Sequence, residues 1–353
     1  MIFVSYGNEI IKNTYDILAA SDIDKYLKAD MQVALKPNLV VPCPASDGAT
    51  THPEVAEGVI LFLRDYGVRQ IKIIESSWVG DSTKRSYEYC GYHGLSEKFD
   101  IPLIDLKSDS FTNYKYDDHE IAVCDEAIST DFLINLPVLK AHCQTNLTCC
   151  LKNLKGCIPD SEKRRFHTLG IHKPVAMLNA VLKTGYCVVD GICGDLSFEE
   201  GGNPVDSKRI IAGRDPLLID SYCAELIGYQ PSEIGYISYA KQMGLGELYS
   251  QSTKLIEINS DSKPTVDLRR DRIADKYKSR IDEDAACSAC YSSLIYALHR
   301  LGGKSAASGK LHIGQGFKGK NGMGIGIGNC AKGFETCVPG CPPKATEIIN
   351  VLS

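Results

Sequence analysis

The 353-residue sequence predicts an α/β fold, a mainly parallel sheet with helices on both faces, followed by a small C-terminal cysteine-rich iron–sulfur module. Two observations predict it. Apolar runs alternate with segments of helical spacing through the first 230 residues, and five of the 15 cysteines gather after residue 286. Alternation of this kind is typical of a parallel sheet covered by helices. The composition changes near residue 265, so we expect an α/β domain at 1–265 and the module at 266–353.

The first strand–helix–strand unit is the clearest. Residues 31–41 begin as a buried strand that ends at Lys36-Pro-Asn38, and residues 70–75 are the next strand. Between them, the segment 51–54 (Thr-His-Pro-Glu) fits a capping box with proline in the first helical turn, and residues 55–66 have helical spacing. A crossover helix between two strands predicts that the strands pair in parallel.

The same alternation continues along the chain. Further strands are expected at 131–137, 186–190 and 208–213, and further helices at 175–182 and 216–227. The charged stretch 261–284 is interpreted as a connector that could include one helix, and residues 288–301 are expected to form a helix. From Gly302 onward the chain is rich in glycine, as expected of loops folded around a metal, and the segment 322–328 is expected to be a strand or tight loop.

The terminal cysteines follow the spacing of a metal site. Cys287 and Cys290 form a CxxC pair, and Cys330, Cys337 and Cys341 follow from a distant segment. Thiolate sulfur is a soft ligand that selects zinc, copper(I) or iron–sulfur clusters. Four thiolates are enough for a structural zinc ion or for a cubane cluster.

The residues around Cys341 favour iron. A cysteine followed by proline is typical of bacterial ferredoxin ligation, and the gap between Cys290 and Cys330 exceeds the common zinc-finger spacing. The string Val-Pro-Gly-Cys-Pro-Pro also resembles the cluster-binding segment in the small cluster subunit of respiratory NADH dehydrogenases and nickel–iron hydrogenases. The prediction is a [4Fe–4S] cluster, with zinc as the alternative. The expected ligands are Cys287, Cys290, Cys330 and Cys341, with Cys337 as the alternate.

Composition sets the cellular context. The ten other cysteines have no framework spacing and are interpreted as reduced, mostly buried thiols of a cytoplasmic protein, in an anaerobic or strongly reducing cell. The N-terminus lacks a signal peptide and no run of 18 apolar residues exists, so no membrane partner is expected. A net charge of −5 gives no support for binding nucleic acid.

Polar residues follow several predicted strands, where ligands bind in parallel sheets. The cations of this set suit an anionic small molecule or cofactor, and the amides can both donate and accept. The expected cofactor-binding residues are Lys36, Asn38, Lys140, Lys152 and Asn153. His142 and His167 are the candidate catalytic acid–base residues, because histidine titrates near neutral pH. A purely structural role is the competing interpretation for both histidines.

These strings resemble those of one family. The matching strings are Leu35-Lys-Pro-Asn38, Asn135-Leu-Pro-Val-Leu-Lys-Ala-His142, Leu151-Lys-Asn-Leu-Lys-Gly156, Arg165-Phe-His167, Asp190-Gly191 and Gly213-Arg-Asp-Pro-Leu-Leu-Ile-Asp220. Over roughly residues 30–260 the chain is similar to the DUF362 family, whose members often carry iron–sulfur modules beside this domain. The resemblance implies the fold and the cluster, and it implies no particular reaction.

Three functions remain open from the sequence. The first is an iron–sulfur oxidoreductase acting on an anion bound at the carboxyl edge of the sheet. The second is a ferredoxin-like carrier that exchanges electrons with a partner protein. The third is a non-redox enzyme in which the metal site is structural.

Overall fold

The computed structural model describes residues 1–269, 271–302 and 309–353. These residues form two compact units. The first unit comprises Met1–Ala141, Leu147–Lys163 and the stretch that runs from His172 to the end of the first described range. The second unit comprises His142–Asn146, Arg164–Ile171 and the described residues from Asp271 onward. Each unit is described by itself.

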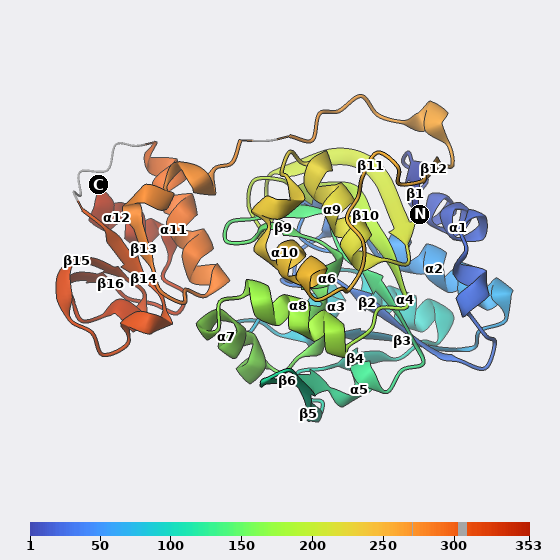
Figure 1. Cartoon of the computed structure of the whole chain (residues 1–353), viewed down its shortest axis with the longest axis horizontal. Coiled ribbons are helices and arrows are strands. Elements are labelled where there is room, and N and C mark those ends of the chain that lie inside the picture. The colour runs from blue at the N-terminus through green and yellow to red at the C-terminus, as the bar shows by residue number, and fades with distance from the viewer. Residues whose placement is uncertain (270, 303–308) are drawn as a thin grey trace. The chain divides into compact units, whose positions relative to one another are not determined.

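The first unit is built on an eight-stranded sheet in the order β12-β1-β11-β10-β7-β2-β3-β4 (Figure 1). Its strands are β1 (Ile2–Tyr6), β2 (Gln32–Pro37), β3 (Gln70–Glu75), β4 (Leu103–Asp105), β7 (Phe132–Leu136), β10 (Tyr186–Asp195), β11 (Pro204–Gly213) and β12 (Leu255–Glu257). Neighbouring strands run parallel except around β11, which is antiparallel to both β1 and β10. The mostly parallel sheet is therefore confirmed.

The strand β11 is the exception to the predicted alternation. Only residues 196–203 separate it from β10, and a parallel return needs a crossover of a dozen or more residues. The two strands therefore pair as a long hairpin, with a register shift between Gly191 and Cys193. The predicted strand at 208–213 exists, but it is the second arm of this hairpin.

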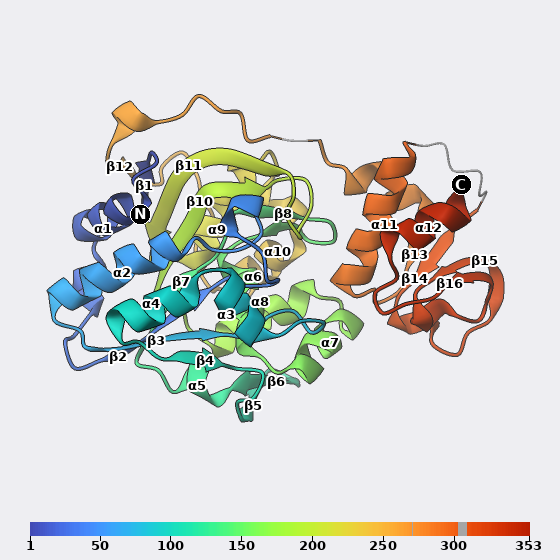
Figure 2. The same ribbon diagram turned by 180° about the vertical axis from the view of Figure 1, so that it is seen from behind.

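Helices cover both faces of the sheet. They are α1 (Ile10–Ala20), α2 (Pro53–Tyr66), α3 (Thr83–Tyr89), α4 (Tyr92–Phe99), α5 (Asp125–Ile128), α6 (Cys150–Asn153), α7 (Asp160–Thr168), α8 (His172–Val181), α9 (Pro216–Leu226) and α10 (Gly235–Gln242). Figure 1 shows α8, α9 and α10 in front of the sheet, and Figure 2 shows α1, α2 and α4 on the opposite face. Apolar side chains of α1, α2, β2 and β3 form much of the core between the sheet and that second layer.

The helix predicted at 55–66 is confirmed as α2, and Gly67 ends it with φ 103°. The predicted capping box is wrong. The helix begins at Pro53 after His52, and His52 makes no side-chain cap. The Thr51 hydroxyl instead accepts the Asn38 N–H at 2.8 Å and donates to the Leu136 carbonyl at 2.7 Å. Thr51 therefore links the ends of two parallel strands instead of closing a helix turn.

Short strand pairs complete the strand set. The antiparallel pair is β5 (Phe111–Tyr116) with β6 (His119–Cys124), and β8 (Lys140–His142) forms a further two-stranded sheet with β9 (Asn146–Thr148). No helix in the described ranges is long and apolar enough to span a bilayer.

The second unit contains a four-stranded sheet in which every pair of neighbouring strands is parallel. Its elements are β13 (Ile281–Glu283), α11 (Ser288–Leu301), β14 (Leu311–Ile313), β15 (Gly322–Ile327), β16 (Phe334–Val338) and α12 (Ala345–Leu352). The helix predicted at 288–301 is confirmed. The glycine-rich end, expected to be mostly loops, supplies three strands. One reason for glycine here is close packing, because a Cβ at Gly326 would lie 2.0 Å from the Ala331 carbonyl oxygen.

Candidate functional site

Four C-terminal cysteines occupy the carboxyl edge of the small parallel sheet. Cys287 follows β13, Cys330 follows β15 and Cys341 follows β16. Because the strands are parallel, their carboxyl ends meet at one edge, which is where ligands bind in such sheets. Cys287 is the N-cap residue of α11, and Cys290 lies in the first turn of that helix. A helix N-terminus favours thiolate, so this CxxC pair is well placed to hold a cation.

The C-terminal thiol groups lie close enough to affect one another's pKa values. Burial raises the pKa of Cys290 to about 12, together with the charges of Cys287, Cys341 and Cys330. Burial raises the pKa of Cys337, whose Sγ lies 3.8 Å from the Gly328 carbonyl oxygen. The four cysteines predicted as ligands thus form one electrostatic group. A bound cation would lower their pKa values and take them as thiolates.

Backbone hydrogen bonds tie the loops that carry Cys330 and Cys341. The Gly328 N–H donates to the Val338 carbonyl at 2.7 Å, and the Asn329 N–H donates to the Gly340 carbonyl at 2.9 Å. In return, the Gly340 N–H donates to Asn329 Oδ1 at 2.8 Å. Gly328 has φ 86°, a conformation that favours glycine, and a Cβ there would lie 3.9 Å from Cys290 Sγ. These contacts hold the two loops in register at the edge of the sheet.

Gln315, which follows β14, also reaches this edge. Its Nε2 lies 3.6 Å from Cys287 Sγ, within reach of an N–H···S hydrogen bond. Donors of this kind to cluster-bound sulfur tune its reduction potential. Each of the four strands of the small sheet is therefore followed by a residue of the cysteine group or by a donor to it.

The spacing of the sulfur atoms bears on which metal they could hold. In the first unit, three potential metal ligands lie close together among the described residues. The ligand atoms of Cys149, Cys150 and Asp220 are within 4.8 Å of one another. In the described ranges, no three of the C-terminal cysteine sulfurs lie within 4.8 Å of one another. Zn–S bonds of about 2.3 Å in a tetrahedron place sulfurs about 3.8 Å apart. A wider arrangement leaves room for a cluster of several iron atoms.

In the first unit, Lys36 belongs to a buried ion pair. It is completely buried, and its Nζ donates to Glu75 Oε2 at 2.8 Å and to the Pro37 carbonyl at 2.7 Å. Glu75 also accepts the N–H groups of Leu39 and Ser76. Lys36, predicted to bind an anion, therefore already has a carboxylate partner from a neighbouring strand. The role of Lys36 in binding a cofactor stays a prediction.

The predicted amides lie beside Lys36 at the same edge. Asn153 Nδ2 donates to the Lys36 carbonyl at 3.1 Å and to Asn135 Oδ1 at 2.8 Å. Asn135 in turn donates to the Cys150 carbonyl at 2.8 Å. Asn38 Oδ1 accepts the N–H of Val40 at 3.3 Å. This chain of amides links β2, β7 and α6.

Lys140 and Lys152 come together around one residue, Glu199. Lys152 Nζ lies 2.9 Å from Glu199 Oε1, and Lys140 Nζ donates to the Glu199 carbonyl at 3.0 Å and to the Ala49 carbonyl at 2.8 Å. Burial lowers the pKa of Lys140 to about 8; Glu199 opposes this effect and Lys152 adds to it. Lys140 can therefore give up or take a proton near neutral pH.

Both candidate histidines lie in segments assigned to the second unit. His142 is buried, and its Nδ1 accepts the N–H groups of Gln144 at 3.0 Å and Thr145 at 3.1 Å. An accepting Nδ1 places the proton of a neutral ring on Nε2. His167 is buried in α7. Their acid–base roles stay predictions.

The sequence analysis missed a third histidine, His52. Its Nδ1 lies 2.8 Å from Asp190 Oδ2, and Asp190 is completely buried. Burial alone would lower the pKa of His52, but the charge and hydrogen bond of Asp190, with a hydrogen bond to Cys193, raise it to about 11. His52 is therefore an imidazolium at the edge of the large sheet. The local sequence resembles a helix start, so no pattern in it distinguished this residue.

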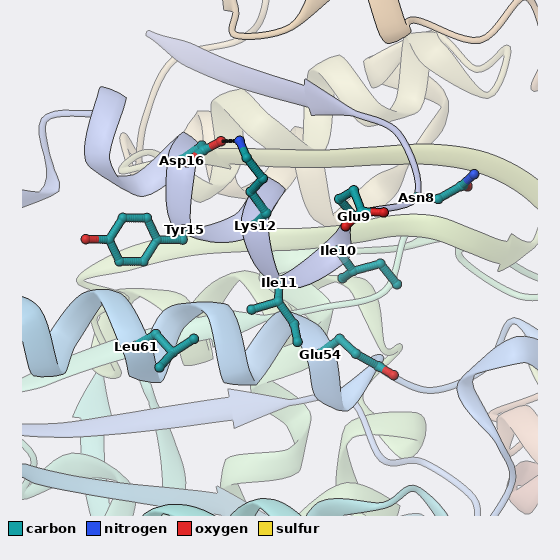
Figure 3. A pocket seen from close by; sticks show the side chains of 9 residues that line it. All are labelled: Asn8, Glu9, Ile10, Ile11, Lys12, Tyr15, Asp16, Glu54 and Leu61. Atoms are coloured by element: carbon teal, nitrogen blue, oxygen red, sulfur yellow. Dashed lines mark hydrogen bonds and ion pairs between the residues drawn. The ribbon is translucent and has the colours of Figure 1, made fainter.

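A groove lies between the start of α1 and α2 (Figure 3). Its lining includes Asn8, Glu9, Lys12, Tyr15 and Glu54. None of the predicted site residues belongs to it.

Comparisons with known proteins identify the family of the chain. The family described as a domain of unknown function, DUF362, matches residues 33–225. The chain is 24% identical over 239 residues to the thylakoid-associated protein sll1697 of Synechocystis sp., a match covering 65% of this chain and 73% of that protein. A solved structure, the lactate racemase apoprotein from Thermoanaerobacterium thermosaccharolyticum, is 12% identical with a TM-score of 0.40, over 69% of this chain and 56% of that one. The chain belongs to the DUF362 family.

Proposed function

We propose that the chain is an iron–sulfur redox protein that holds a [4Fe–4S] cluster through Cys287, Cys290, Cys330 and Cys341. The observation that carries the proposal is the convergence of these thiols at the carboxyl edge of one small parallel sheet. The raised pKa of Cys290, caused by burial and by the other three thiols, supports it. The Cys-Pro sequence after the last ligand supports iron, because it is typical of bacterial cluster ligation.

The residues present fit a cluster better than a single zinc ion. No three of the four sulfurs, all in the described ranges, lie within 4.8 Å of one another, whereas a tetrahedral zinc site places all four about 3.8 Å apart. Gln315 can donate to Cys287 Sγ, and Gly328 allows backbone to approach Cys290 closely. When bound, a [4Fe–4S] cluster accepts and donates single electrons. The protein would hold the cluster on three chain segments and tune its potential with N–H donors.

We further propose an oxidoreductase in which the first unit binds an anionic small molecule. Lys140 and Lys152 supply two ammonium groups. The Glu199 carboxylate contacts Lys152, and the Glu199 carbonyl accepts from Lys140. Among the described contacts, Lys140 uses two of its three N–H donors on carbonyl oxygens, which leaves one that could bind an anionic ligand. The lowered pKa of Lys140, to about 8, suits it to proton transfer that accompanies electron transfer.

A ferredoxin-like carrier is the second candidate, and the exposure of Cys341 favours it. An exposed ligand brings the edge of a cluster to the surface, where a partner protein could exchange electrons. The carrier would exchange electrons with such a partner without needing Lys140. The oxidoreductase should lose turnover of its substrate when Lys140 is replaced by methionine, with the cluster signal unchanged.

The primary test is an anaerobic preparation, reconstituted with iron and sulfide, and examined by EPR after dithionite reduction. We expect an S = 1/2 signal and roughly four irons and four sulfides per chain. The Cys290→Ser variant should lose most of the iron, whereas the matched Cys337→Ser variant should keep it. A colourless protein without iron or labile sulfide would refute the proposal. Tightly bound zinc in place of iron would support the structural-metal alternative.

A further inference from the structure

A second group of thiols lies in the core of the first unit. Cys149 and Cys150 are at the start of α6, and Asp220 and Cys223 are one turn apart on α9. All four side chains are completely buried. The sequence interpretation treated these cysteines as scattered core thiols, because they are separated by some seventy residues along the chain.

The ligand atoms are spaced as a single metal ion requires. The sulfurs of Cys149 and Cys150 are 3.9 Å apart, and Asp220 offers an oxygen within 4.8 Å of both. A tetrahedral site with Zn–S bonds of about 2.3 Å has sulfurs about 3.8 Å apart. Cys223 is hydrogen-bonded to Cys149 and is therefore the nearest candidate for a fourth ligand.

The carboxylate of Asp220 is oriented for this role. Its Oδ1 accepts the Cys150 N–H at 2.7 Å, and its Oδ2 accepts the Leu151 N–H at 3.0 Å. Each oxygen keeps a lone pair beyond these hydrogen bonds. Such hydrogen bonds fix a ligating carboxylate in place, as partners around metal ligands commonly do.

A bound cation would balance the charge of this carboxylate when it is ionised. Within the described ranges, none of the ion pairs includes Asp220. An ionised carboxylate without a counter-charge is costly to bury. A divalent cation bound between Asp220 and the cysteines would supply that charge.

We propose that Cys149, Cys150, Asp220 and Cys223 form a structural site for a divalent metal ion of the zinc class. Three thiolates and one carboxylate suit zinc, which accepts sulfur and oxygen ligands in tetrahedral geometry. Binding releases the thiol protons to solvent and involves no change of oxidation state. The ion would link α6 to α9, and Cys187, which is hydrogen-bonded to Cys150, would support the ligands from β10. This site is independent of the C-terminal cysteines.

The test uses the full chain carrying Cys287→Ser and Cys290→Ser, which weakens metal binding by the C-terminal group. This protein, loaded anaerobically with Co²⁺ in place of zinc, should bind about one ion per chain and show thiolate-to-cobalt charge-transfer absorption. Adding Cys149→Ser should remove the absorption and at least about nine tenths of the cobalt. Adding Cys124→Ser, a change at another completely buried thiol of the first unit, should leave both unchanged.

A measurement that needs no further substitution guards against misfolding of the Cys149→Ser variant. X-ray absorption at the zinc edge, recorded on the Cys287→Ser, Cys290→Ser chain, should give a mixed shell of about three sulfurs and one oxygen. A four-sulfur shell, or no zinc or cobalt bound by this chain, would overturn the proposal. Equal cobalt binding with and without a folded Cys149→Ser change would overturn it as well.

Discussion

His52 and Asp190 are joined twice through a single oxygen atom. Asp190 Oδ2 accepts the His52 backbone N–H at 2.7 Å and lies 2.8 Å from the imidazole Nδ1. The other oxygen of Asp190 accepts the Ile192 N–H at 3.0 Å. This pair fixes the start of α2 against β10, two elements that are more than a hundred residues apart in the chain.

The pair should make stability depend on pH. The folded-state pKa of His52, raised to about 11, exceeds the ordinary value of about 6.5. Its contribution is therefore fully present below about pH 6.5 and is lost progressively as pH rises toward 11. Urea unfolding of the His52→Gln variant at about pH 6 and about pH 9.5 should show a destabilisation that is larger at pH 6 by more than about 1 kcal/mol.

The control for this prediction is His93→Gln, which changes an exposed histidine of α4. Its effect should be small at both pH values. A His52→Gln effect of equal size at both pH values would show that the histidine does not carry this linkage.

The buried pair of Lys36 and Glu75 should be a large structural contributor. Lys36→Met removes the ammonium and leaves a buried carboxylate without its cation, which typically costs about 3–5 kcal/mol. The matched control is Lys12→Met, which breaks an exposed pair with Asp16 and should cost at most about 1 kcal/mol. Denaturant unfolding measures both. Similar values for the two variants would argue that Lys36 is free to serve a ligand.

Gly156 packs directly over this ion pair. A Cβ at that position would lie 2.1 Å from Glu75 Oε1 and 2.5 Å from Lys36 Nζ, and both side chains are buried. Gly156→Ala should therefore destabilise the protein by about 1–3 kcal/mol, as overpacking of a core does. The contrasting change is Gly94→Ala in α4, where a Cβ meets nothing within 4 Å.

If this packing is correct, thermal or denaturant unfolding should show changes in the free energy of unfolding of opposite sign for the two glycine variants. Gly94→Ala should stabilise the protein by about 0.5–1 kcal/mol, because alanine has the higher helix propensity. A neutral Gly156→Ala would mean that the loop around it can move away from Lys36.

The sequence predicted well the elements that depend on local patterns. The helix at 288–301 has apolar residues at helical spacing and Gly302 as its stop, and the structure begins and ends α11 at the same residues. The strand at 70–75 was likewise predicted with its exact bounds. The antiparallel pairing of β10 and β11 was not predicted, because the alternation of strands and helices along the chain does not specify whether two strands pair in parallel or antiparallel.

The cationic residues show what a local pattern leaves open. Lys36 follows an apolar run as a ligand residue would, but Glu75, from the next strand, is its partner at 2.8 Å. Lys152 has the same ambiguity, because the Glu199 carboxylate is its partner at 2.9 Å, whereas Lys140 donates to the Glu199 carbonyl. The charge a lysine presents to a ligand depends on neighbours that come from distant parts of the chain.

By itself, the sequence determined the α/β class, the family and the cysteines that could act together near the C-terminus, because spacing and residue type carry that information along the chain. Only the tertiary structure decided that β11 runs antiparallel to its neighbours, that Lys36 forms an ion pair with Glu75, and that His52 contacts Asp190. It also brought together Cys149, Cys150, Asp220 and Cys223. Sheet pairing and helix packing bring such residues together, and no spacing within a single segment encodes those contacts.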